Sequence, residues 1–86
     1  MATYYVYVVT CADTTLYTGV TTDPERRLKE HNGQYARGAK YTQSRRPVHL
    51  SYVEPCENRS EAQRREAAIK ALSRAQKHHL IDSQVK

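Results

Sequence analysis

The sequence predicts a small α+β domain in which helices flank a three-stranded antiparallel sheet. Two segments rich in β-branched and aromatic residues, 3–10 and 16–21, lie close together, and a third with alternating polarity follows at 48–54. Helix start signals come after the second and the third of these segments. Because consecutive strands joined by a short turn pair antiparallel, the predicted order is ββα, a loop and then βαα.

The first two segments form a predicted hairpin, with Asp13 as the turn former. Side chains alternate along a strand, so pairing of odd-numbered with odd-numbered residues gives two distinct faces. One face gathers the expected core residues Val6, Val8, Leu16 and Val20. The other gathers Tyr7 and Tyr17 beside the space above Gly19. Two phenols beside a glycine can form a site that a ligand approaches closely, and cross-strand packing with the hydroxyls at the solvent rim is the simpler alternative.

A helix is predicted directly after the hairpin. Asp23 can cap it, Pro24 suits the first helical position, and Gly33 is the expected C-terminal stop. The segment 34–47 is polar, basic and without apolar periodicity. We therefore expect a loop there, with room for one helical turn.

Two more helices are predicted towards the C-terminus. Ser60 with Gln63 matches a capping box within the helical stretch "NRSEAQRREAAIKAL". Ser73 with Gln76 repeats the pattern. A second helix is therefore predicted to start there, at an angle to the first.

Length and charge limit the possible functions. The chain has 86 residues, which predicts one domain over 1–86, and its net charge is +5. A basic chain of this size favours nucleic acid first and an anionic membrane surface second, and surplus surface charge is the plain alternative. Cys11 and Cys56 lie far apart, so we expect no disulfide and no zinc site, and a reducing cytoplasm is the predicted location. No stretch resembles a signal peptide or reaches transmembrane length, so no membrane partner is predicted.

The first predicted helix carries a candidate phosphate-binding pair. Arg27 and His31 are four residues apart and share one helical face, and Asp23 can pair with Arg27 across the preceding turn. The arginine fork suits a phosphate, and His31 can carry a proton or bond a phosphate near neutral pH. A solvated helix face is the alternative for these residues.

Glu66 is the candidate acid on the next helix. It shares a face with Ala62 and Ile69, which places a carboxylate at the border of the buried stripe. A carboxylate there needs a partner, because unpaired burial is costly. Lys70, four residues on, is one such partner. A divalent metal is the other, since one carboxylate with phosphate oxygens and waters is a common way to hold Mg²⁺.

Taken together, these residues resemble the GIY-YIG endonuclease family. The pattern is "YVY", nine residues, "YTG" and then "DPERRLKEH". In that family two tyrosine motifs lie on the first two strands, an arginine follows on the first helix, and a glutamate lies on a later helix. The segments "LYTGVTTDPERRLKEHN" and "SEAQRREAAIKAL" look most like those of its small single-domain bacterial UPF0213 group. The resemblance covers essentially the whole chain and implies the GIY-YIG fold.

The resemblance implies a metal-dependent endonuclease that hydrolyses phosphodiester bonds in nucleic acid, with DNA favoured over RNA. The residues that match catalytic positions of the family are Tyr7, Tyr17, Arg27, His31 and Glu66. Glu66 matches the metal ligand, and a single Mg²⁺ or Mn²⁺ is the implied cofactor. Gly19 matches the glycine of the second tyrosine motif.

The implied mechanism gives each of these residues a role. Arg27 grips the phosphate and stabilises its developing charge. Either Tyr7 or Tyr17 orients or deprotonates the attacking water, which requires its pKa to be lowered from about 10. His31 relays the proton. Cationic side chains are predicted to hold the nucleic-acid backbone, namely Arg37, Lys40, Arg45, Arg46 and Lys70.

The chain departs from the family pattern at three positions. Tyr5 stands where the first motif has glycine, Val6 where it has isoleucine, and Thr18 where the second motif has isoleucine; the valine is a conservative change. These departures bear on activity more than on the fold. Two other functions stay open: a nucleic-acid-binding module of the same fold without cleavage, and a protein-interaction domain whose charge only solvates its surface.

Overall fold

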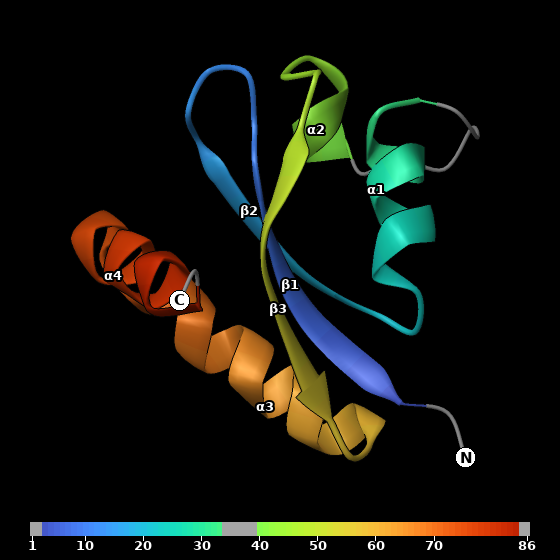
Figure 1. Cartoon of the computed structure of the whole chain (residues 1–86), viewed down its shortest axis with the longest axis vertical. Helices are drawn as coiled ribbons and strands as arrows, with labels where there is room; N and C mark the ends of the chain where they lie inside the picture. Colours follow the sequence, from blue (N-terminus) through green and yellow to red (C-terminus); the bar gives the residue numbers. More distant parts are fainter. Residues whose placement is uncertain (1–2, 34–39, 85–86) are drawn as a thin grey trace.

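A computed structural model of the chain describes residues 3–33 and 40–84, with residues 40 and 41 described by their backbone alone (Figure 1). The predicted contacts of Arg37 and of the Lys40 side chain lie outside the described residues. The elements in chain order are β1 (Tyr4–Thr10), β2 (Leu16–Thr21), α1 (Pro24–His31), α2 (Lys40–Gln43), β3 (His49–Cys56), α3 (Arg59–Lys70) and α4 (Arg74–Gln84). The predicted α+β class and element order are confirmed, with α2 as the single helical turn of the central loop. In the described part of the chain, none of the helices is long and apolar enough to cross a membrane.

The three strands form one antiparallel sheet in the order β2-β1-β3. Tyr7 pairs with Gly19 and Val9 with Tyr17, so odd-numbered residues do pair with odd-numbered ones and the two faces are those described from the sequence. β3 runs two residues further than predicted and includes Pro55. Proline is tolerated there because β3 is an edge strand, with one side free of ladder hydrogen bonds.

The sheet is buried on both faces (Figure 1). The face with Val6 and Val8 is a core face, as predicted; it packs against Ala62 and Ile69 of α3, and residues of α4 add to it. The other face carries Tyr7 and lies under α1. A tyrosine hydroxyl at the solvent rim was the simpler expectation for Tyr7, and it is wrong, because only 2% of this side chain is exposed.

Local interactions set the hairpin turn between β1 and β2 and the two ends of α1. The Oδ1 atom of Asp13 accepts hydrogen bonds from the backbone N–H and the hydroxyl of Thr15, at 3.1 and 2.6 Å, which fixes the hairpin turn. Asp23 caps α1 as predicted, and its carboxylate accepts the N–H of Arg26 at 3.1 Å. Gly33 follows the helix with φ of +89°, a conformation that favours glycine.

Of the two capping boxes predicted for α3 and α4, one is confirmed and one is wrong. The capping box predicted at Ser60 is wrong: Asn58 is the N-cap, and its side-chain oxygen accepts the N–H of Glu61 at 2.8 Å. The box at Ser73 and Gln76 is confirmed, because each side chain bonds the backbone N–H of the other, at 2.9 and 3.2 Å. α4 therefore starts afresh and leaves α3 at an angle (Figure 1).

Candidate active site

Tyr7 of β1 lies directly over Gly19 of β2. A Cβ built on Gly19 would come within 2.6 Å of Cζ of Tyr7. Glycine is required at this position because the phenol ring occupies the volume of a side chain. The predicted space for a ligand above Gly19 is therefore filled by Tyr7 itself, which is a correction to the sequence-based expectation.

A buried hydrogen-bonded pair joins β1 to α1. The hydroxyl oxygen of Tyr7 lies 2.8 Å from Nε2 of His31, and His31 is fully buried. The other ring nitrogen, Nδ1, lies 2.9 Å from Oγ1 of Thr42 on α2. Tyr17 packs edge-on against the imidazole, with ring centroids 5.2 Å apart. Both nitrogens of His31 are thus engaged inside the protein, so the alternative in which His31 bonds a phosphate directly is wrong.

The surroundings of His31 keep its ring neutral at physiological pH. Its pKa is lowered to about 4, chiefly by burial and also by the positive charges of Arg27 and Arg46, while Glu30 acts in the opposite direction. The phenols of Tyr7 and Tyr17 are the other titratable groups in contact with the ring. A neutral imidazole can accept a proton through one nitrogen and donate through the other.

We expect the buried His31 to make the fold less stable in acid, at pH values above those at which carboxylates titrate. The folded pKa of His31 is depressed below its unfolded value, so its contribution to stability is present above pH 6.5 and is lost as pH falls towards 4. At about 1.4 kcal/mol per pKa unit, the free energy of unfolding should fall by about 2 kcal/mol between pH 7.5 and pH 5.

Urea unfolding at the two pH values tests this expectation. The His31→Gln variant is the control, because it removes the titrating ring and should flatten the slope in this window. An equally steep slope in the variant would assign the acid sensitivity to other groups.

An arginine of α1 acts on the same phenol through its charge. Arg27 donates from Nη1 to Oε1 of Glu30 at 2.8 Å, and its positive charge acts to lower the pKa of Tyr7. Glu30, which is largely buried, also lies 3.5 Å from Nε of Arg26. The predicted partner of Arg27 is corrected, because Asp23 is used as the helix cap and Glu30 takes its place.

Opposing effects act on the ionisation of this pair. The pKa of Tyr7 is raised to about 12, chiefly by burial; the nearby Arg27 opposes the rise, and the charges of Tyr17 and Glu66 add to it. Burial on its own would lower the pKa of Arg27, but its hydrogen bond to Glu30 and its interaction with Tyr7 outweigh that effect and raise it. Tyr7 is therefore a neutral phenol at pH 7, and Arg27 a held cation.

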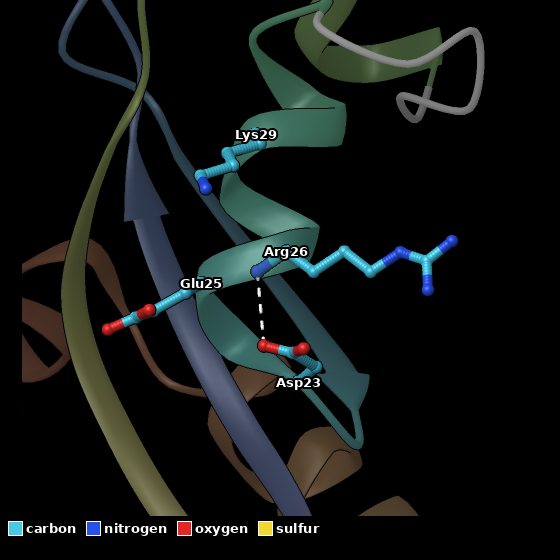
Figure 2. A pocket seen from close by; sticks show the side chains of 4 residues that line it. All are labelled: Asp23, Glu25, Arg26 and Lys29. Atoms are coloured by element: carbon cyan, nitrogen blue, oxygen red, sulfur yellow. Dashed lines mark hydrogen bonds between the residues drawn. The ribbon is translucent and has the colours of Figure 1, made fainter.

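Two pockets lie beside α1 and the segment that precedes it. Asp23, Glu25, Arg26 and Lys29 line one of about 330 Å³, and Figure 2 shows Arg26 extending from the opposite side of the helix to Glu25 and Lys29. The other, of about 510 Å³, is lined by Thr21, Thr22, Asp23, Arg26, Arg27 and Glu30. We call the second the Arg27 pocket. It gives an anion access to the guanidinium of Arg27, whose charge acts on the Tyr7 phenol.

Glu66 lies where the sequence predicts, at the border of the buried stripe of α3. Its side chain is 26% exposed, whereas Ala62 and Ile69 on the same face are buried. Lys70 Nζ lies 3.5 Å from its Oε2, so the ion-pair partner is confirmed. Its charge also reaches Tyr7.

One accessible carboxylate with room for waters and phosphate oxygens fits the way Mg²⁺ is commonly held. No group of three or more metal-ligating His, Cys, Asp or Glu side chains occurs among the described residues, so the part of the chain that is described offers no dedicated metal cage.

Two of the predicted backbone-binding arginines have structural contacts. Nε of Arg45 lies 3.1 Å from Oδ2 of Asp13 in the hairpin turn. Nε of Arg46 donates to the backbone carbonyl of His31 at 2.7 Å, at the C-terminal end of α1. The first contact ties the segment after α2 to the hairpin turn, and the second ties it to α1 at His31. The role of Arg45 and Arg46 in binding nucleic acid stays a prediction.

Sequence reasoning missed two members of the site. Glu30 was detectable, because it stands three residues after Arg27 and four after Arg26, the spacing of helical ion pairs. Thr42 had no such signal, because it lies in a polar segment without periodicity and meets His31 only in the folded chain. Of the predicted catalytic residues, Tyr7, Tyr17 and His31 meet through contacts with one another, and Arg27 and Glu66 act on them through their charges.

Comparison with known proteins gives consistent similarities. A family model described as the GIY-YIG catalytic domain matches residues 3–79. A UPF0213 protein of Desulfotalea psychrophila is 55% identical over 83 residues, which cover 96% of this chain and 74% of that protein. A UPF0213 protein of Natronomonas pharaonis is 52% identical over 80 residues, with 93% of this chain and 92% of that protein covered.

Solved structures agree with the fold. The solution NMR structure of a UPF0213 protein from Bacillus halodurans is 41% identical, with a TM-score of 0.59, and covers 93% of this chain and 83% of that one. The solution NMR structure of a protein from E. faecalis is 43% identical, with a TM-score of 0.64, and covers 100% of this chain and 91% of that one. The three-stranded antiparallel sheet with its flanking helices is thus shared with these proteins.

Proposed function

Because the chain belongs to the GIY-YIG family and to its UPF0213 group, we propose that it is a divalent-metal-dependent endonuclease that hydrolyses phosphodiester bonds in nucleic acid, with DNA favoured over RNA. The observation that carries the proposal is the phenol oxygen of Tyr7, which is hydrogen-bonded to a neutral buried histidine and is acted on by the charge of Arg27. This arrangement suits a hydroxyl that takes and passes on a proton beside an anion.

Arg27 is the proposed phosphate ligand. Its guanidinium is 25% exposed and lines the Arg27 pocket, so a phosphate entering that pocket meets a cation held in place by Glu30. A preorganised cation stabilises the charge that develops on the phosphate without reorganising during the reaction. Glu30 acts through Arg27 and is a positioning residue.

Tyr7 is the proposed base. Its pKa of about 12 makes a stable phenolate at pH 7 unfavourable. The hydroxyl avoids that state if it passes its own proton to Nε2 of His31, 2.8 Å away, while it takes one from the attacking water. Tyr17, half-buried beside both rings, orients the water.

Glu66 is the proposed holder of a single Mg²⁺ or Mn²⁺, together with waters and phosphate oxygens of the substrate. A bound metal supplies charge stabilisation on the scissile phosphate and the leaving oxygen. Lys70 shares this carboxylate in the free protein, so metal and Lys70 are expected to compete for it. With one carboxylate, metal affinity should be weak until nucleic acid is present.

The departures from the family pattern do not disturb the strands that carry the site. Tyr5 pairs with Thr21 and Thr18 with Val8 in a regular ladder, and Thr18 is buried. Activity is therefore proposed despite them. Arg45, Arg46 and Lys70 are the proposed backbone contacts, and such contacts should weaken as salt rises.

A nicking assay tests the proposal. Purified protein with Mg²⁺ or Mn²⁺ should cut at least one member of a panel of duplex, flapped, nicked and hairpin DNA and RNA. Glu66→Ala should lower the rate by roughly 10²-fold or more, because a bound metal supplies several kcal/mol. Its stability should change by only about 0.5 kcal/mol, since the lost i,i+4 ion pair is largely solvated.

Glu57→Ala is the matched control, because Glu57 is an exposed carboxylate that precedes α3. It should cut at the wild-type rate. Equal residual cleavage by wild type and Glu66→Ala would identify a contaminant and contradict the proposal. Salt-dependent binding that is indifferent to metal and to Glu66→Ala, without cleavage, would instead support a binding module of the same fold.

A further inference from the structure

We propose that Thr42 of α2 is a positioning residue that holds His31 with its proton on Nδ1, so that Nε2 is left to accept the proton of Tyr7. The catalytic consequence of this inference rests on the proposed endonuclease function. The direction of the hydrogen bonds rests on the structure alone.

The contacts at His31 allow two closed arrangements. Its Nε2 lies 2.8 Å from the Tyr7 hydroxyl and its Nδ1 lies 2.9 Å from the Thr42 hydroxyl. A neutral imidazole carries one proton, so it donates at one end and accepts at the other. Hydroxyls can do either, so these two distances alone leave the direction undecided.

The buried phenol decides the direction. Its proton needs an acceptor, because Tyr7 is 2% exposed and an unsatisfied buried donor is costly. Nε2 of His31 is the acceptor in contact. The imidazole proton must therefore lie on Nδ1, where it is donated to Oγ1 of Thr42.

Thr42 is well placed to end this chain of hydrogen bonds. It is fully buried, and its hydroxyl can accept from His31 while its own proton is donated elsewhere. Its backbone carbonyl accepts the N–H of Arg45 at 3.0 Å, and Arg45 is tied to the hairpin turn through Asp13 and the N–H of Ala12. The turn between β1 and β2 thus anchors the segment that orients the histidine.

The consequence is that Nε2 is available to accept the phenol proton. Protons can move from the phenol to Nε2, and Thr42 keeps its hydrogen bond to Nδ1–H when the ring becomes charged. Removing such a tautomer-fixing partner commonly costs 10- to 100-fold in activity, and we expect a loss of about that size in kcat with little change in KM.

The test begins with the wild-type protein. Nitrogen-15 NMR of the histidine ring at pH 7 reports which nitrogen carries the proton, and we expect Nδ1. A proton on Nε2 would overturn the proposal. This measurement needs no cleavage, so a failed inference and a failed endonuclease proposal are told apart.

Two variants test the role of the hydroxyl. Thr42→Val keeps the shape of the side chain and removes the acceptor, so the Nδ1 and Nε2 resonances should change and kcat should fall. Thr42→Ser restores the hydroxyl and should return both readouts towards wild type. Unchanged ring resonances in Thr42→Val, or equal kcat in Thr42→Val and Thr42→Ser, would overturn the proposal.

Discussion

Replacing Gly19 by alanine is expected to destabilise the protein by about 3 kcal/mol, near the upper range for an overpacked core position. The new methyl group would lie within 2.6 Å of Cζ of Tyr7. The ring cannot easily move away, because its hydroxyl is bonded to His31 and α1 covers it. Urea unfolding measures the loss. Any folded fraction should also be inactive, since relief of the clash moves the catalytic hydroxyl.

A double-mutant cycle with Tyr7→Ala separates the clash from other effects of the substitution. Away from such a neighbour, alanine in place of glycine in a strand should stabilise by roughly 0.5–1 kcal/mol. Gly19→Ala should therefore be neutral or stabilising in the Tyr7→Ala background, with a coupling energy of about 3 kcal/mol. An equal cost in both backgrounds would show that the ring is not what requires glycine.

Tyr7→Phe is expected to lower kcat by about 10²- to 10⁴-fold, the range of a lost general base. The phenylalanine ring still fills the space over Gly19, so the fold should persist. The substitution leaves Nε2 of His31 without its phenol partner in a buried site, which should cost about 1–3 kcal/mol of stability. Single-turnover cleavage below the unfolding transition measures the rate, and urea unfolding measures the stability.

Tyr17→Phe is the matched control for the assignment of the base. Tyr17 loses the same hydroxyl but is half-buried at the edge of the imidazole. Its rate should fall by about 10-fold or less, as for a residue that orients water without taking its proton. A larger loss for Tyr17→Phe than for Tyr7→Phe would exchange the roles of the two tyrosines.

Most of the fold could be predicted because it depends on local patterns. Alternation in β1 and β2 assigned Tyr7 and Val6 to opposite faces and Tyr17 and Gly19 to the same face, and the Asp23 cap with the proline after it indicated the start of α1. The start of α3 could not be predicted, because Asn58 and Ser60 are both good capping residues and only the chain path into the helix selects the first.

Burial of the site could not be predicted from those patterns. Alternation assigns side chains to a face but does not say whether that face meets solvent or a helix. From alternation alone, the face with Tyr7 could lie in solvent. In the folded protein α1 covers it. The same packing turned His31 from an exposed candidate phosphate ligand into a neutral buried ring, because desolvation penalises the charged imidazole.

By itself, the sequence determined the strands and helices, the α+β class, the family resemblance, and the chemical types available to the site: two phenols, an arginine, a histidine and a glutamate. Only the tertiary structure decided that Tyr7 fills the space above Gly19, that Glu30 holds Arg27, and that Thr42 meets His31. The physical reason is the range of the interactions. Propensity, alternation and capping act within a few residues, whereas burial and hydrogen-bond direction depend on groups that meet only when the chain is folded.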